Sequence, residues 1–284
     1  MDDGDVLVNE KRVKASYKVR ENDEIEIELT ELPATRFEAE NIPLDIVFED
    51  GYLAVINKPA GMAVHPGAGM SSGTLANAIA YHFQPQCVEQ GPTKDGTQNE
   101  NRIGIVHRLD KDTSGLIVVA KDEQTAEELS RQFHDREVEK SYIALVHGAI
   151  DEKRGKIDAP LGRDRHNRLK IRVTQTGRNA LSLWKVRQRF EKFTLLDVEI
   201  KTGRTHQIRV HLAHINHPVV GDATYSEGRD KTVADLAVRK AIADLGRFFL
   251  HAERLVFTHP KTGERLEFQH ALPPELKEFL HLLS

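Results

Sequence analysis

Apolar and polar positions alternate over two short stretches near the N-terminus. Residues 6–9 and 12–13 predict a hairpin, and residues 24–29 alternate strictly, as a strand with one solvated face does. A module of about 30 residues is too small to bury a hydrophobic core alone. Residues 35–43 are predicted to be a linker. The pattern therefore predicts a small module at 1–34 and one larger domain at 44–284.

The larger domain mixes apolar runs with amphipathic segments. Runs rich in β-branched residues or alternating in polarity predict strands at 44–49, 52–57, 103–106, 116–120, 140–146, 169–173, 180–186 and 194–200, and on both sides of 259–263. Helices are predicted at 74–83 and 125–135, after Thr205, and from Pro274, with Thr74 and Thr205 as N-caps of the first and third. Because strands and helices do not alternate as βαβ units, the predicted fold class is α+β.

Composition places the chain among soluble globular proteins. Hydrophobic residues make up 39% and charged residues 30% of it, which excludes a disordered chain. No run approaches the roughly 20 apolar residues of a membrane span, and the acidic N-terminus has no signal pattern. The single cysteine, Cys87, excludes an intramolecular disulfide and a multi-cysteine zinc site. It fits a reducing cytosol, so we expect a cytoplasmic protein without a membrane partner.

The formal net charge of −4 is unevenly distributed along the chain. Residues 1–34 carry −5, and their basic side chains all fall within ten positions (Lys11, Arg12, Lys14, Lys18, Arg20). Residues 161–189 carry +8, from nine basic side chains and Asp164. Such clustering is typical of a surface that follows a phosphate backbone. The alternative is a solvated strand pair whose charges only keep it soluble.

Ionisable side chains concentrate in the loop 107–115, between two predicted buried strands. Asp110 and Asp112 share a face if the backbone is extended, whereas Leu109 and Lys111 point the other way. Loops held by a rigid scaffold commonly carry catalytic groups. A turn rich in Asp, Thr and Ser is also common as a solvated turn, and that alternative stays open here.

A second concentration lies at 201–217, where four histidines suggest a metal site. His206 and His211 are five positions apart, which places them about 140° apart around a helix. His211 and His214 can share a face, but no acid lies between them and no cysteine is near. We therefore expect no metal, and a metal-dependent nuclease or hydrolase using this cluster remains a rival. Arg204 or Arg209 is expected to point into the site and pair with a carboxylate.

Several motifs, taken together and in order, resemble RNA pseudouridine synthases of the large-subunit ribosomal RNA type. The loop at 107–115 resembles the signature of that family, and 203–211 resembles its arginine-bearing motif. The remaining matches are 57–61 with 64–66, 140–142, 250–252 and 259–264. The resemblance covers residues 44–284 and implies a pseudouridine synthase fold, a mixed and mostly antiparallel sheet flanked by helices and loops.

The resemblance implies an isomerase that converts specific uridines of RNA, above all 23S ribosomal RNA, to pseudouridine without a cofactor. Asp110 matches the essential aspartate, acting either as nucleophile or as base. Arg209 is expected to keep Asp110 ionised, and Tyr142 to stack on the target base. Arg108 is expected as a wedge or phosphate contact where the flipped uridine leaves its stack.

The N-terminal module resembles the second half of an S4 RNA-binding domain, without the helical first half. Its expected RNA contacts are Lys11, Arg12, Lys14 and Lys18, and those of the larger domain are Arg108, Arg163, Arg165, Arg168 and Arg204. The expected partner is ribosomal RNA, bound by a monomer. A non-catalytic RNA-binding regulator of the S4 type is the second rival. It explains only a small part of the chain, whereas the larger part carries the loop 107–115.

Overall fold

The computed structural model describes residues 6–8, 11–12, 20, 23–27, 38–67, 70–83, 104–164, 167 and 170–284. It divides into two compact units, Met1–Arg36 and Phe37–Ser284. In the smaller unit, β1 (Val6–Val8) pairs antiparallel with β2 (Lys11–Arg12) and with β3 (Ile25–Ile27). The predicted N-terminal hairpin and the strand that follows it are both present.

The segment predicted as a linker belongs in part to the larger unit. The side-chain amide of Asn77 donates to the carbonyl of Glu38 at 2.8 Å, and the amide of Glu40 donates to the carbonyl of Asn77 at 3.0 Å. These bonds fasten residues 38–40 to the first helix, so the division between the units falls before Phe37.

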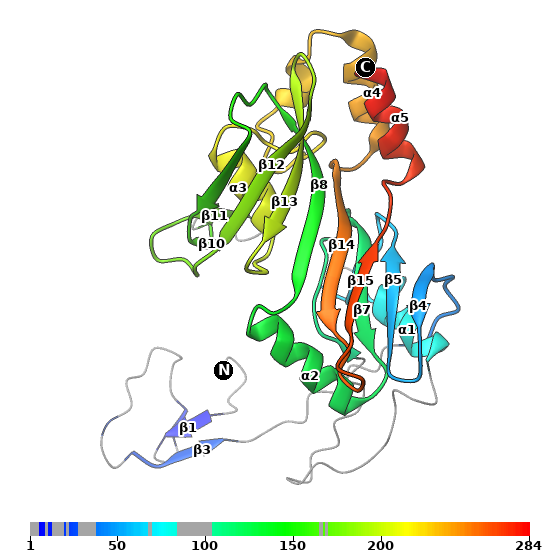
Figure 1. Cartoon of the computed structure of the whole chain (residues 1–284). Coiled ribbons are helices and arrows are strands. Elements are labelled where there is room, and N and C mark those ends of the chain that lie inside the picture. Colours follow the sequence, from blue (N-terminus) through cyan, green and yellow to red (C-terminus); the bar gives the residue numbers. More distant parts are fainter. Residues whose placement is uncertain are drawn as a thin grey trace. The chain divides into compact units, whose positions relative to one another are not determined.

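A ten-stranded sheet forms the larger unit within its described residues (Figure 1). Its neighbours pair antiparallel except β7 and β14, which are parallel, so the mixed and mostly antiparallel sheet is confirmed. The main path runs β4 (Ile46–Glu49), β5 (Leu53–Lys58), β7 (Ser114–Ala120), β14 (Leu250–Thr258), β8 (Glu139–His147), β13 (Phe193–Ile200), β12 (Leu181–Arg189), β9 (Arg154–Asp158).

Four further strands complete the β structure of the larger unit within its described residues. The strand β15 (Arg265–Gln269) pairs with β14, and β6 (Gly104–Ile105) pairs with β7. A separate hairpin joins β10 (Leu161–Arg163) to β11 (Ile171–Val173). The hairpin holds the first part of the basic stretch 161–189 and lies beside α3 in Figure 1.

The described helices are α1 (Leu75–His82), α2 (Glu123–His134), α3 (Gln207–His214), α4 (Leu236–Leu245) and α5 (Pro274–Leu282), with a 3₁₀ turn at Arg229–Thr232. None of them has the length and apolar character that crossing a bilayer requires. Thr74 caps α1 as predicted, since its hydroxyl accepts from the amide of Asn77.

The predicted cap of α3 is wrong. The helix begins after His206, which has a left-handed φ of 54°, and Thr205 does not cap it. The cause is Gln207, whose side-chain oxygen accepts from the Thr202 hydroxyl at 2.7 Å and from the amide of Arg204 at 3.1 Å. These hydrogen bonds close the loop that precedes the helix, so the first helical residue is Gln207.

The strand that follows loop 107–113, β7, is buried on both faces. In β7 every residue is buried, and alternate side chains enter two different hydrophobic clusters. Ile117 and Val119 pack in the cluster that contains α1, whereas Leu116 and Val118 pack in the cluster that contains Leu129 of α2. A strand buried in this way is a rigid support for the polar loop that precedes it.

Candidate active site

A cleft of about 1010 Å³ opens in the larger unit where four segments meet. Its walls come from the loop after β6, the C-terminal end of α2, the start of β8 and the turn before α3. The cleft brings together five residues proposed from the sequence, which lie up to 101 positions apart: Arg108, Asp110, Tyr142, Arg204 and Arg209.

Arg209 is held between two carboxylates. Its Nη1 donates to Oδ2 of Asp110 at 3.1 Å. Its Nε and Nη2 donate to the two carboxylate oxygens of Asp222 at 2.7 and 2.9 Å. The Asp222 side chain is fully buried, whereas 19% of the Asp110 side chain is exposed. Asp222 therefore fixes the guanidinium, and Asp110 keeps a face toward the cleft.

Aromatic rings enclose the same guanidinium. Its central carbon lies 4.2 Å from the centre of the Phe248 ring and 5.1 Å from that of the Tyr225 ring. Both rings therefore make cation–π contacts with Arg209. Burial opposes the charged form of Arg209, but its hydrogen bonds and charge interactions with Asp222 and Asp110 raise its pKa above the ordinary value. Arg209 therefore remains a cation beside Asp110.

The buried side chain of Lys58 supports the loop that carries Asp110. Lys58 has no exposed surface, and its Nζ donates to the carbonyls of Pro59 at 2.7 Å, Met62 at 2.9 Å and Lys111 at 3.0 Å. The Lys111 carbonyl belongs to the loop that carries Asp110, so Lys58 ties this loop to the end of β5. Burial, aided by the charge of Arg247, lowers the pKa of Lys58 to about 7.

Tyr142 lies on β8 in the wall of the cleft and is 7% exposed. Its hydroxyl forms no hydrogen bond to another residue in the described part of the chain. Burial and, secondarily, the negative charge of Asp110 raise its pKa. The hydroxyl therefore stays protonated and is available as a donor inside the cleft.

The four histidines at 206–217 turn toward different partners. The Nδ1 of His206 lies 2.8 Å from the Tyr225 hydroxyl, and the Nδ1 of His211 lies 2.9 Å from the Ser182 hydroxyl. His217 donates to the carbonyl of His147 at 2.8 Å, and His214 is exposed. Within the described ranges, no three His, Cys, Asp or Glu side chains converge as a metal would need. The nuclease alternative has no ligand set there.

The proposed RNA-contact residues fall into three groups. Arg108 and Arg163 are exposed, and Arg204 is half-buried with its Nε 3.4 Å from the carbonyl of Asn179. Lys11 and Arg12 lie in β2, with side chains outside the described residues. Lys14, Lys18, Arg165 and Arg168 lie outside them entirely.

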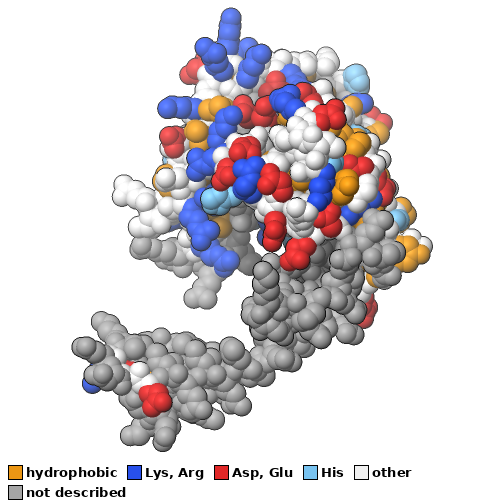
Figure 2. All heavy atoms as spheres, turned by 60° about the horizontal axis from the view of Figure 1, so that its bottom comes forward, with side chains coloured by type: hydrophobic (Ala, Val, Ile, Leu, Met, Phe, Trp, Pro, Cys, Tyr) orange, Lys and Arg blue, Asp and Glu red, His pale blue; other side chains and the backbone are white. Residues whose placement is uncertain are grey.

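The basic stretch 161–189 is less uniform than its net charge suggests. Arg187 forms ion pairs with Asp197 at 2.6 Å and Glu253 at 2.5 Å, and Arg189 donates to the carbonyl of Ile150 at 2.9 Å. These two cations therefore stabilise the sheet through contacts within the protein. Arg163, Lys170, Arg172 and Arg178 are on or beside the β10–β11 hairpin. Figure 2 shows Lys and Arg side chains gathered along one side of the larger unit.

Asp222 and Tyr225 contact the proposed site residues but were not predicted from the sequence. Tyr225 links two parts of the site, because its hydroxyl accepts from the amide of Ile171 in β11 at 3.0 Å and contacts His206. Asp222 follows Arg209 by 13 positions and lies beyond the end of α3, where no periodicity relates the two. A lone acid in a Gly-Asp turn carries no signal that it will meet a particular arginine.

Comparison with known proteins identifies the family to which the chain is similar. A family model described as RNA pseudouridylate synthase matches residues 52–214. A protein named uncharacterized RNA pseudouridine synthase YlyB, from Bacillus subtilis, is 43% identical over 262 residues, which cover 92% of this chain and 80% of that protein. A ribosomal large subunit pseudouridine synthase D from Nitrosomonas europaea is 46% identical over 227 residues, covering 80% of this chain and 61% of the relative.

Solved structures show the same fold. The human RNA pseudouridylate synthase domain containing 1 aligns with a TM-score of 0.64 and 26% identity, over 85% of this chain and 89% of that one. The resemblance read from the motifs is therefore confirmed, and neither rival function is supported. The chain belongs to the RNA pseudouridine synthase family.

Proposed function

We propose that this pseudouridine synthase modifies uridines of large-subunit ribosomal RNA, and that Asp110 is its catalytic carboxylate. The observation that carries the site assignment is the 3.1 Å hydrogen bond from Arg209 to Asp110 at the floor of the cleft. The substrate class follows the name of the Nitrosomonas europaea relative, which shares 46% identity with this chain.

The reaction requires no external reagent. The bond between C1′ of the ribose and N1 of uracil breaks, the base turns, and a bond from C1′ to C5 forms. C5 loses its proton and N1 ends protonated, so the nucleotide keeps its composition. The Asp110 carboxylate facing the sugar suits this task, and the hydrogen bond from Arg209 holds it in place.

Tyr142 and Arg108 complete the proposed site. The Tyr142 ring offers a face for the flipped uracil, and its protonated hydroxyl offers a donor. Arg108 is exposed two positions before Asp110, where it can occupy the vacated stack or contact phosphate. Arg204 and the cations of the β10–β11 hairpin are proposed to hold the RNA backbone.

The remaining assignments concern the protein around the site. We propose that the small N-terminal sheet is a partial S4-like RNA-binding module whose basic side chains add RNA contacts. The side chains proposed to act on the uridine, Asp110, Tyr142 and Arg209, all line one cleft of the larger unit, and we propose that the protein acts as a monomer. A single cysteine and an RNA substrate support a cytoplasmic location.

The test uses unmodified large-subunit ribosomal RNA with tritium at C5 of its uracils. Wild-type protein should release tritium as the C5–C1′ bond forms. Asp110→Asn should abolish release while RNA affinity stays within about two-fold, because an uncharged amide of the same shape cannot act as nucleophile or base. Asp151→Asn, at an exposed turn, is the matched control. Substantial turnover by Asp110→Asn would overturn the site assignment.

Mapping pseudouridines in RNA from cells that lack the gene would identify the target.

A further inference from the structure

A second cationic position faces the cleft from β8. Lys140 precedes Tyr142 by two positions on this strand, so their side chains leave the same face of the sheet roughly 7 Å apart. Both residues line the cleft that contains Asp110. The phosphate backbone of a nucleotide bound at Tyr142 therefore lies within reach of the Lys140 ammonium.

The stem of Lys140 rests on an aromatic pair. Its Nζ lies 5.1 Å from the centre of the Phe133 ring, and that ring stacks on His107 with centroids 4.4 Å apart. The Nε2 of His107 accepts a hydrogen bond from the amide of Val118 at 3.0 Å, so the imidazole is neutral. The aromatic support is uncharged, so it does not compensate the charge of Lys140.

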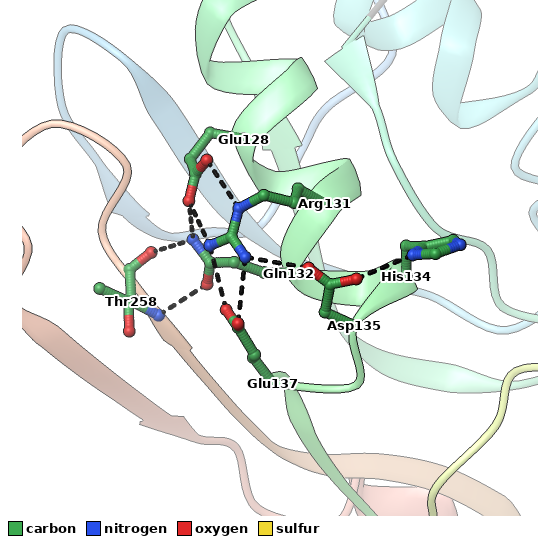
Figure 3. Close-up of polar contacts among 7 residues, drawn as sticks. All are labelled: Glu128, Arg131, Gln132, His134, Asp135, Glu137 and Thr258. Carbon is green, nitrogen blue, oxygen red and sulfur yellow. Dashed lines mark hydrogen bonds and ion pairs between the residues drawn. The ribbon is translucent and has the colours of Figure 1, made fainter.

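The carboxylates nearest to Lys140 in the chain are already paired (Figure 3). Arg131 binds Asp135 and Glu137, each at 3.0 Å, and Glu139 pairs with Arg254 at 2.9 Å on its own side of β8. No carboxylate in the described part of the chain forms an ion pair with Lys140. Burial lowers its pKa to about 8. An anion entering the cleft would compensate this charge.

Arg136 adds a second cation to the same wall. It follows the end of α2, lines the cleft and is exposed, and its side chain has no partner among the described residues. Its φ is 65°, the left-handed conformation that glycine adopts at little cost and other residues rarely adopt. An arginine at this strained position provides a charge that a more stable glycine would not.

We propose that Lys140 and Arg136 form a subsite for a phosphodiester of the RNA strand next to the target uridine. This inference rests on the proposed function and names a further substrate contact of the same site. Lys140 acts on binding and not on chemistry. Among the described residues, the Asp110 carboxylate pairs with Arg209 and not with Lys140. Loss of Lys140 should therefore raise KM and leave kcat unchanged.

The test measures RNA affinity at several salt concentrations in the Asp110→Asn background, which prevents turnover. Lys140→Gln and Arg136→Gly should each weaken binding several-fold and reduce the slope of log affinity against log salt by about 1, the effect of one lost phosphate contact. Lys140→Arg should keep the slope. Lys277→Gln, an exposed lysine of α5, is the matched control and should change neither quantity.

Arg136→Gly keeps the experiment decisive if Lys140→Gln disturbs folding, because glycine relieves backbone strain at this position. Unchanged slopes in both variants would overturn the subsite. A fall in the kcat of Lys140→Gln, measured with Asp110 intact, together with unchanged affinity would overturn it as well. The two proposals fail separately. If wild-type protein releases no tritium, the proposed function fails, while the salt slopes still decide whether these cations contact phosphate.

Discussion

Arg209 reaches Asp110 with one N–H group at 3.1 Å while Asp222 occupies two others. The geometry makes Asp222 a positioning residue, since it orients the cation that meets Asp110, the proposed catalytic carboxylate. The Asp110–Arg209 pair joins a loop to a helix 99 positions further along the chain. The geometry of this pair therefore depends on the fully buried side chain of Asp222.

Replacing Asp222 by Asn should lower kcat by about 100-fold, the effect of a misplaced catalytic group. RNA affinity should not change, because Asp222 is buried and does not face the cleft. Single-turnover tritium release and filter binding measure the two quantities, and Asp222→Glu should restore part of the rate. Asp244→Asn, exposed on α4, is the control. A parallel loss of affinity would show that Asp222 has a wider structural role.

Replacing Lys58 by Met should destabilise the protein. Three carbonyls would lose their donor in a fully buried site, and each unsatisfied buried group costs about 1–3 kcal/mol. We expect the free energy of unfolding in urea to fall by at least about 2 kcal/mol. Lys111→Met changes an exposed lysine nearby and should stay within about 0.5 kcal/mol. Equal stability of the two variants would contradict the support assigned to Lys58.

Acid should destabilise the fold through His107. Burial, with a smaller effect of Lys140, lowers its folded-state pKa to about 3, below the ordinary value of about 6.5 in the unfolded chain. Between these values the unfolded state binds more protons, so the free energy of unfolding falls as pH falls from about 6.5 toward 3.

The variant His107→Gln removes this titration and keeps an acceptor for the Val118 amide. Its unfolding free energy should decline less between pH 7 and pH 4 than that of wild type, by about 2 kcal/mol. Urea unfolding at each pH measures the difference. Parallel declines would show that His107 binds its proton equally well in the folded and unfolded states, which would contradict the lowered pKa.

Gln132 should matter more for stability than the conspicuous ion pairs beside it (Figure 3). Its side-chain amide pairs with both backbone groups of Thr258, donating at 2.8 Å and accepting at 3.0 Å, and it is 1% exposed. Gln132→Leu removes both hydrogen bonds to the Thr258 backbone and should cost about 2 kcal/mol.

Arg131→Gln is the contrasting variant. Arg131 contacts Glu128, Asp135 and Glu137 at a surface where solvent and salt screen the interactions, so the melting temperature should fall less than in Gln132→Leu. Differential scanning calorimetry at low and high salt compares them. A larger effect of Arg131→Gln would show that the network acts cooperatively.

Reversing the charge of Arg163 should weaken RNA binding and flatten its salt dependence. The side chain is exposed on β10, at the edge of the basic hairpin. One lost phosphate contact lowers the salt slope by about 1. Arg187→Gln removes a cation of the same stretch that is paired with Asp197 and Glu253, and it should leave the slope unchanged. Equal slopes in wild type and Arg163→Glu would place the RNA elsewhere.

Local pattern accounts for most of the sheet and for the first helix. The apolar runs predicted β5 and β7, and Thr74 marked the start of α1. The edge strand β9 was not predicted, because only Ile157 in it is a buried apolar residue. The start of α3 was misplaced because the side chain of Gln207 closes the preceding loop, a contact that propensity does not contain.

The sequence by itself determined the family and the loop that carries Asp110, since both depend on residues close together in the chain. Only the tertiary structure decided which charges meet. Asp222 binds Arg209, Arg187 pairs with acids of neighbouring strands, and no carboxylate among the described residues forms an ion pair with Lys140. Ion pairs and buried hydrogen bonds act over about 3–4 Å, and distances of that order between remote positions exist only after the sheet has folded.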